Sequence, residues 1–128
     1  FFFKQKTAYE IYQCDWSSDV CSSDLTSWMT SMKKGDYVRC HSHGWSDISG
    51  VYYYRTNGED GNLMFENPNE NINSTFCYAN YSRSVVFKPS VGSMLLFPGW
   101  LRHSVTTNDT DYHRNSISFN VLLIDKTI

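Results

Sequence analysis

Short β-type runs separated by turn signals make up most of this chain from Trp28 onward, and no segment there shows the 3.6-residue period of a long helix. The strongest run is ISGVYYYR at residues 48–55. It is followed at residues 56–61 by Asn-Gly and Asp-Gly pairs, which supply the positive φ angles of tight turns. Such strands bury their apolar residues by packing sheet against sheet, so the pattern predicts an all-β sandwich or barrel.

We expect about seven short strands arranged as a jelly roll, the cupin-like double-stranded β-helix. The run at residues 103–106 is expected to pair with the last strand, 115–124, through a hairpin turn at 107–113. Residues 66–82 are polar and rich in Asn, which indicates a long surface loop. The remaining strands are predicted at residues 36–43, 62–65, 85–88 and 93–97.

Residues 1–25 differ from the rest of the chain and resemble translated sequencing-adapter sequence. They lack the charged-then-apolar layout of a secretion signal. We expect an artefactual or disordered prefix there, with a weak helix at residues 4–13 as the alternative. The domain would then be residues 26–128, and we expect it to lack natural N-terminal sequence, including strands that the fold needs.

Composition limits the partners of this chain. Its net charge of −2 gives no basic surface for nucleic acid or for an anionic membrane. No apolar run is long enough to span a bilayer. Cys40 and Cys77, the cysteines outside the prefix, lack metal-type spacing and form no disulfide framework, so a reducing, cytoplasmic location is expected. The oligomeric state is left open.

The first candidate site is the His-x-His pair of His41 and His43. On a strand, side chains two residues apart project from the same face, here together with Tyr37 and Arg39. Two imidazoles on one rigid strand provide two metal-ligand directions at little entropic cost. The alternative is a pair of surface histidines on an edge strand.

A third histidine, His103, follows the apolar run at residues 94–97 and a Pro-Gly break. A buried strand at 94–97 would deliver this imidazole to the interior. Core histidines are more often simply hydrogen-bonded than ligating, but this chain has only four. Asp47, four residues after His43, adds a nearby carboxylate.

The last predicted strand carries a polar stripe on one face: Arg114, Ser116, Ser118 and Asn120. An arginine binds a carboxylate through two parallel charge-assisted hydrogen bonds, and Ser116 can add a third. The stripe therefore indicates a binding site for an anionic ligand. The alternative is a strand face exposed to water.

From Trp28 to about Val121 the chain resembles the 2-oxoglutarate/Fe(II) oxygenases of bacteria and phages. Five blocks occur in that family's order and spacing. They are KKGDY at residues 33–37, HSH at 41–43, SGVYY at 49–53, FPGWLRH at 97–103 and RNSISFN at 114–120.

The resemblance implies that His41 and His103 bind Fe(II) and that Arg114 with Ser116 holds the distal carboxylate of 2-oxoglutarate. Most members of the wider superfamily use His-x-Asp, which completes a facial triad of two histidines and a carboxylate.

Here that third position is His43, and SHGWSD replaces the His-Pro-x-Ser usual in this family. The third ligand is then either His43, which gives a site of three histidines, or the carboxylate of Asp47. The strand face favours His43, the superfamily's chemistry favours a carboxylate, and we choose His43.

The implied activity is that of a dioxygenase using Fe(II), 2-oxoglutarate and O2, a hydroxylase of an unspecified small-molecule or peptidyl substrate. One alternative is a cupin-type metal enzyme without 2-oxoglutarate, with Asp47 as a ligand and no role for Arg114. Another is a non-catalytic jelly-roll binding module. Candidates to line or close the pocket are the aromatic residues Tyr37, Trp45, Tyr52, Tyr54 and Trp100.

Overall fold

The computed structural model describes residues 22–69 and 83–124. The helix considered for residues 4–13 and most of the loop expected at 66–82 lie outside these ranges. The described residues form eight strands and no helix, as the all-β prediction requires, and none of them forms a helix able to span a membrane. The strands are β1 (Ser22–Met32), β2 (Val38–His41), β3 (Ile48–Arg55), β4 (Leu63–Glu66), β5 (Ser84–Phe87), β6 (Met94–Pro98), β7 (His103–Val105) and β8 (Arg114–Ile124).

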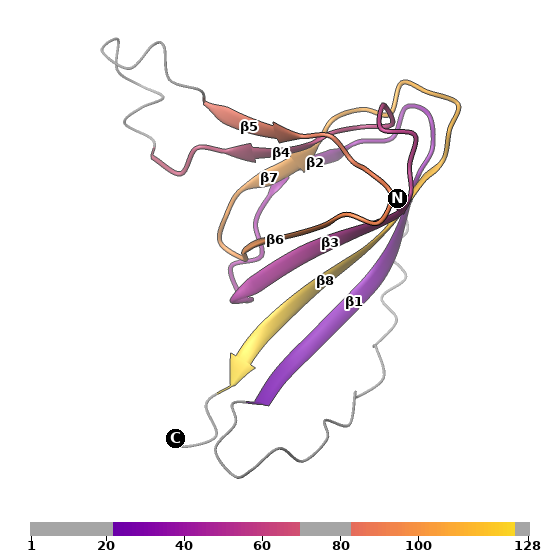
Figure 1. The fold of residues 1–128 in the computed structure, drawn as a ribbon. Coiled ribbons are helices and arrows are strands. Elements are labelled where there is room, and N and C mark those ends of the chain that lie inside the picture. The colour runs from indigo at the N-terminus through magenta and orange to yellow at the C-terminus, as the bar shows by residue number, and fades with distance from the viewer. Residues whose placement is uncertain (1–21, 70–82, 125–128) are drawn as a thin grey trace.

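The strands form two four-stranded antiparallel sheets that lie as two layers (Figure 1). The first sheet has the order β1-β8-β3-β6, and the second has the order β2-β7-β4-β5. Successive strands mostly alternate between the sheets, so the inner faces of both sheets are assembled from distant parts of the sequence. This arrangement is the predicted jelly roll.

The longest strand pair was not expected from the sequence. β1 pairs with β8 from Ser22 opposite Ile124 to Met32 opposite Arg114. Its sequence, SSDLTSWMTSM, lacks the alternation of a half-buried strand, and β1 begins within residues 1–25. The partner strand β8, rather than local propensity, therefore decides the conformation of this segment.

The predicted hairpin between residues 103–106 and 115–124 is wrong. β7 pairs with β2 and β4, whereas β8 pairs with β1 and β3, so the intervening chain crosses between the sheets. The fully buried Asn108 fixes this crossing, since its Nδ2 donates to the carbonyls of Met32 at 3.2 Å and Tyr112 at 2.8 Å. The chain between β7 and β8 must cross from one sheet to the other so that each strand can place an apolar face in the common core.

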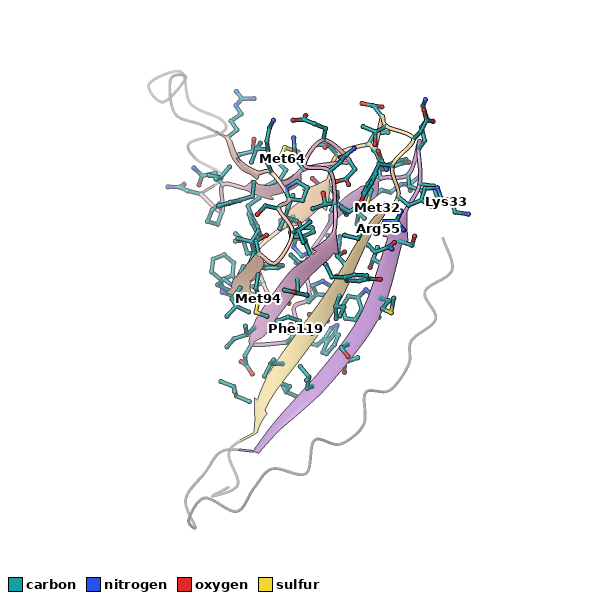
Figure 2. All side chains as sticks on the ribbon, turned by 45° about the vertical axis from the view of Figure 1, so that its right-hand side comes forward. Met32, Lys33, Arg55, Met64, Met94 and Phe119 are labelled. Carbon is teal, nitrogen blue, oxygen red and sulfur yellow. The ribbon has the colours of Figure 1, made fainter. Side chains whose placement is uncertain are left out.

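The hydrophobic core lies between the sheets. Val51 and Tyr53 of β3 meet Leu63 and Phe65 of β4 there, and four half-buried side chains pack around them: Leu95, Phe97, Leu101 and Val105. Met32 and Arg55, at the ends of β1 and β3, lie at one end of the first sheet, where β8 begins with Arg114, and Phe119 lies further along β8 (Figure 2).

Candidate metal centre and ligand cavity

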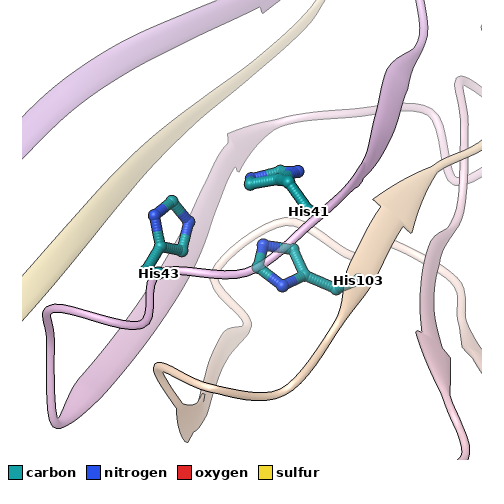
Figure 3. Close-up of side chains that lie close together, drawn as sticks. All are labelled: His41, His43 and His103. Carbon is teal, nitrogen blue, oxygen red and sulfur yellow. The ribbon is translucent and has the colours of Figure 1, made fainter.

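Three imidazoles converge on one point between the sheets (Figure 3). His41 ends β2 and His103 begins β7, and the two residues are direct cross-strand partners with ring centroids 4.4 Å apart. The ring of His43 lies 4.9 Å from that of His41 and 5.3 Å from that of His103. His103 is buried against Phe97, at 4.8 Å between ring centroids.

The geometry of this cluster suits a single metal ion. One ligand atom from each imidazole lies within 4.8 Å of the others, and no other group of three potential ligands occurs in the part of the chain that the structure describes. Two nitrogens that bind one ion at about 2.1 Å each are at most about 4.2 Å apart. Small side-chain rotations therefore allow the three residues to share an ion.

His43 reaches the cluster from a turn and not from the strand that we expected to carry both histidines. β2 ends at His41, and His43 N–H then donates to the carbonyl of Gly99 at 2.7 Å. The carbonyl of His43 accepts from Ser46 N–H at 2.9 Å. Backbone hydrogen bonds of two adjoining turns therefore position this imidazole.

The register of β2 against β7 shifts between Val38 and His41. Such a bulge interrupts the alternation of side chains between the two faces of a strand. Val38 and His41 both line the cavity between the sheets, whereas Tyr37 and Arg39 are exposed. The expectation that these two share a face with the histidines is therefore wrong.

Backbone carbonyls orient two of the three imidazoles. Nδ1 of His41 lies 2.8 Å from the carbonyl of Arg39, and Nδ1 of His103 lies 2.9 Å from that of Leu101. A carbonyl accepts only, so each Nδ1 carries a proton, and in the neutral form of the ring the free lone pair is then on Nε2. This is how metal-binding histidines are commonly held.

The protonation of the cluster also favours a cation. Burial, followed by the charges that His41 and His103 would carry, lowers the pKa of His43 to about 4. Burial lowers the pKa of His103 as well, against the opposing effect of its hydrogen bond to Leu101. Both imidazoles are neutral at pH 7, the state in which they can donate a lone pair.

Asp47 lies outside the imidazole cluster. It is exposed just before β3, and its Oδ2 accepts a hydrogen bond of 2.7 Å from the backbone N–H of Leu123 in β8. Its own N–H donates to the carbonyl of Val121 at 2.9 Å. Asp47 thus joins the turn to the first sheet.

A cavity between the sheets contains the imidazole cluster and the polar stripe of β8. None of the aromatic residues Tyr37, Trp45, Tyr52, Tyr54 and Trp100 lines it. Tyr52 lies on the opposite face of β3 from Val51 and Tyr53, and Tyr37, Trp45 and Trp100 are at least half exposed. The lining residues include Trp28, Thr30, Val38, His41, His43, Ser49, Val51, Tyr53, Leu63, Phe97, His103, Val105, Arg114, Ser116, Ser118, Phe119 and Asn120.

The guanidinium of Arg114 is a buried cation on this cavity. The residue is 2% exposed, its Nη1 donates to the carbonyl of Gly61 at 2.9 Å, and its Nε has no hydrogen-bond partner. Within residues 22–69 and 83–124, no carboxylate lies within ion-pair distance of it. Burial lowers the pKa of Arg114, which remains a cation at pH 7.

Sequence reasoning missed Trp28, Thr30 and Tyr53 as lining residues. The ring of Tyr53 lies 5.5 Å from the guanidinium carbon of Arg114, and that of Trp28 lies 6.0 Å from the ring of His43. Both faces of β3 carry tyrosines, so alternation alone does not separate Tyr53 from Tyr52. The pairing of β1 with β8, which turns Trp28 and Thr30 inward, has no local signal.

A jelly roll with three clustered imidazoles and a buried arginine in one cavity has the side chains to hold a metal ion and an anionic ligand together. Residues 26–120 match the family model described as "Putative 2OG-Fe(II) oxygenase", and the chain belongs to this family. No curated protein matches the chain significantly.

Solved structures share the fold at low sequence identity. A 2OG-Fe(II) oxygenase family oxidoreductase from Burkholderia pseudomallei aligns with 86% of this chain and 50% of its own, at 14% identity and a TM-score of 0.63. A Pseudomonas putida prolyl-4-hydroxylase aligns with 76% of this chain and 50% of its own, at 16% identity and a TM-score of 0.57. HygX from Streptomyces hygroscopicus with iron bound aligns with 77% of this chain and 57% of its own, at 12% identity and a TM-score of 0.57.

These similarities confirm the double-stranded β-helix fold. The chain spans only 50 to 57% of the three structures. HygX has also been solved with nickel and 2-oxoglutarate bound.

Proposed function

We propose that this chain is the catalytic jelly roll of a 2-oxoglutarate- and Fe(II)-dependent oxygenase, and that it hydroxylates a small-molecule or peptidyl substrate in the cytoplasm. Membership of the family supports the reaction class. The observation that carries the proposal is the buried guanidinium of Arg114, which has no ion-pair partner among the described residues and lies on the same cavity as the imidazole cluster. That combination suits a metal ion and an anionic co-substrate held side by side.

His41, His43 and His103 are the proposed iron ligands. Imidazole is a suitable ligand for Fe(II), and three protein ligands leave positions open for a co-substrate and O2. When bound, Fe(II) with 2-oxoglutarate and O2 supplies the oxidising chemistry. The protein's part is to present three imidazoles from two strands and a turn.

His43 is a better third ligand than Asp47 on two grounds. The ring of His43 lies with the other two imidazoles, and its lowered pKa keeps it unprotonated. The Asp47 carboxylate is engaged by the backbone N–H of Leu123 and is not part of the cluster. The cupin-type alternative, which requires Asp47 as a ligand, has no such support.

Arg114 and Ser116 are the proposed binding site for the distal carboxylate of 2-oxoglutarate. The nearby Asp60 carboxylate only partly offsets the burial of this cation, because the pKa of Arg114 is still lowered, and a bound carboxylate would offset the burial further. Ser116 is 2% exposed and lies two residues along the same inner face. Tyr53 adjoins the guanidinium, and burial raises its pKa, so its hydroxyl stays protonated and can donate to a carboxylate.

An anaerobic visible spectrum of the Fe(II)-loaded chain, recorded before and after addition of 2-oxoglutarate, tests the proposal. A new charge-transfer band is expected, because the keto acid chelates the iron. Iron binding without such a band, in folded protein, would point instead to a cupin-type enzyme that does not use 2-oxoglutarate or to a binding module.

A further inference from the structure

A chain of buried polar side chains connects the ring of His43 to its own backbone carbonyl. Asn120 Nδ2 lies 3.4 Å from Nδ1 of His43, and Asn120 Oδ1 accepts from Ser49 Oγ at 2.7 Å. Ser49 Oγ lies 3.2 Å from Ser46 Oγ, which donates to the carbonyl of His43 at 3.0 Å. Asn120, Ser49 and Ser46 are 1%, 2% and 7% exposed.

His43 differs from the other two histidines in what faces its Nδ1. His41 and His103 each place Nδ1 against a backbone carbonyl, which fixes the proton there and leaves Nε2 free. His43 has the amide of Asn120 in that position instead. An amide presents either a donor or an acceptor, and a half-turn about its last bond exchanges the two.

We propose that Asn120 is the positioning residue for His43, and that in the metal-bound protein its Oδ1 accepts the Nδ1 proton of His43. This inference rests on the proposed function, because it takes His43 as a metal ligand. The tautomer with the proton on Nδ1 leaves the Nε2 lone pair of His43 for the metal, as in the other two histidines.

With Asn120 in this orientation, each side chain in the series donates one hydrogen bond to the next. Asn120 Nδ2 then donates to Ser49 Oγ, Ser49 Oγ donates to Ser46 Oγ, and Ser46 Oγ donates to the carbonyl of His43. This series of hydrogen bonds therefore begins at the ring of His43 and ends at the backbone carbonyl of the same residue. It also joins β8 and β3 of the first sheet to the turn that follows β2 in the second.

Zinc binding by the full chain tests the proposal, with Zn(II) alone as a diamagnetic probe. The informative pair is Asn120→Leu, which keeps the size and removes the acceptor, and Asn120→Asp, which restores an acceptor. Asn115→Leu is the matched control, since Asn115 lies on the same strand but not on the cavity. Circular dichroism checks folding, and ¹⁵N shifts of labelled histidine report the tautomer of His43.

We expect the wild-type protein with zinc to show His43 protonated at Nδ1. Asn120→Leu should lose roughly 10- to 100-fold in zinc affinity, the usual cost of removing an outer hydrogen-bond partner of a ligand. Asn120→Asp should bind zinc at least as tightly as the wild type, and Asn115→Leu should bind it equally well. Rescue by the aspartate separates positioning from a merely structural role.

Unchanged zinc affinity and an unchanged His43 tautomer in Asn120→Leu would overturn the assignment of Asn120, as would equal losses in the leucine and aspartate variants. Failure of the proposed function has a different signature. In that case His43→Ala would bind zinc as tightly as the wild type, so the three-imidazole site itself would be rejected.

Discussion

At the scale of single residues, the site depends on the charge states of three wholly or partly buried groups. His43 and His103 are held neutral, while Arg114 stays charged without a carboxylate partner among the described residues. Neutral nitrogen donors suit a cation and a buried guanidinium suits an anion. Three predictions belong to this scale.

Replacing the proposed third ligand should weaken metal binding, while replacing its rival should not. We expect His43→Ala to lose more than the roughly 10- to 100-fold in Fe(II) affinity that removal of an outer partner costs. Asp47→Ala should stay close to the wild type, because that carboxylate serves a backbone N–H. Anaerobic titration with Fe(II) measures both variants, and the reverse order would make Asp47 the ligand.

Arg114→Lys should weaken 2-oxoglutarate binding roughly 10- to 100-fold, since one or more charge-assisted hydrogen bonds are lost while the positive charge remains. Iron affinity should not change. The concentration of 2-oxoglutarate that half-develops the charge-transfer band gives the result. Arg55→Lys, at an exposed arginine stacked on Tyr112, is the control. Equal loss of iron and 2-oxoglutarate would contradict the role of Arg114.

The metal-free protein should become less stable as the pH falls from about 6.5 to about 4. The pKa of His43 is about 4 in the folded chain and near its ordinary value of 6.5 when unfolded, so the unfolded state binds more protons in this window. The lowered pKa of His103 acts in the same direction. Urea unfolding across this range should show a smaller decline for His43→Gln, and an identical decline would refute the explanation.

At the scale of elements, two interlocked turns hold His43 in place. The turn after β2 and the turn after β6 exchange backbone hydrogen bonds, with His43 N–H donating to Gly99 at 2.7 Å and Gly99 N–H donating to Asp47 at 3.1 Å. A Cβ at Gly99 would overlap the carbonyl and the hydroxyl of Ser46 and would lie 2.7 Å from the carbonyl of His43. Only glycine allows the two turns this close.

Gly99→Ala should therefore destabilise the protein by about 1–3 kcal/mol, as overpacking commonly does, and should also weaken metal binding because His43 is displaced. Gly44→Ala is the matched control in the same region, since a Cβ there meets nothing within 4 Å. Urea unfolding and zinc titration test both variants. Equal behaviour of the two alanine variants would show that the close approach does not position His43.

At the scale of the whole molecule, the site needs both sheets. His41 and His103 come from β2 and β7 of the second sheet, while Arg114, Ser116 and Asn120 come from β8 of the first. Phe97 of β6 and Phe65 of β4 pack against each other and against His103, which couples the core to a proposed metal ligand.

Metal should consequently stabilise the entire fold and not only one loop. Zinc at 100 times its dissociation constant adds about 2.7 kcal/mol to the folded state. For a domain of this size, that corresponds to a rise on the order of 10 °C in Tm. A chelator should reverse the rise, and His103→Ala should show little of it. An equal rise in His103→Ala would indicate zinc binding elsewhere.

The sequence alone determined the class of fold and the chemistry available to it. Alternating runs and turn pairs specify an all-β chain, because side-chain period and positive φ are local properties. The direction of the β8 side chains, with Arg114 and Asn120 pointing inward, is also set locally, because side chains alternate between the two faces of a regular strand. For the same reason the polar stripe was predictable in full.

Tertiary structure decided the remainder. A bulge in β2 separated Tyr37 and Arg39 from His41, and a turn held by Gly99 brought His43 to the cluster. The crossing from β7 to β8 replaced the expected hairpin, and β1 became a strand through its partner. These features depend on contacts between residues far apart in the chain, whose energies do not appear in any local pattern.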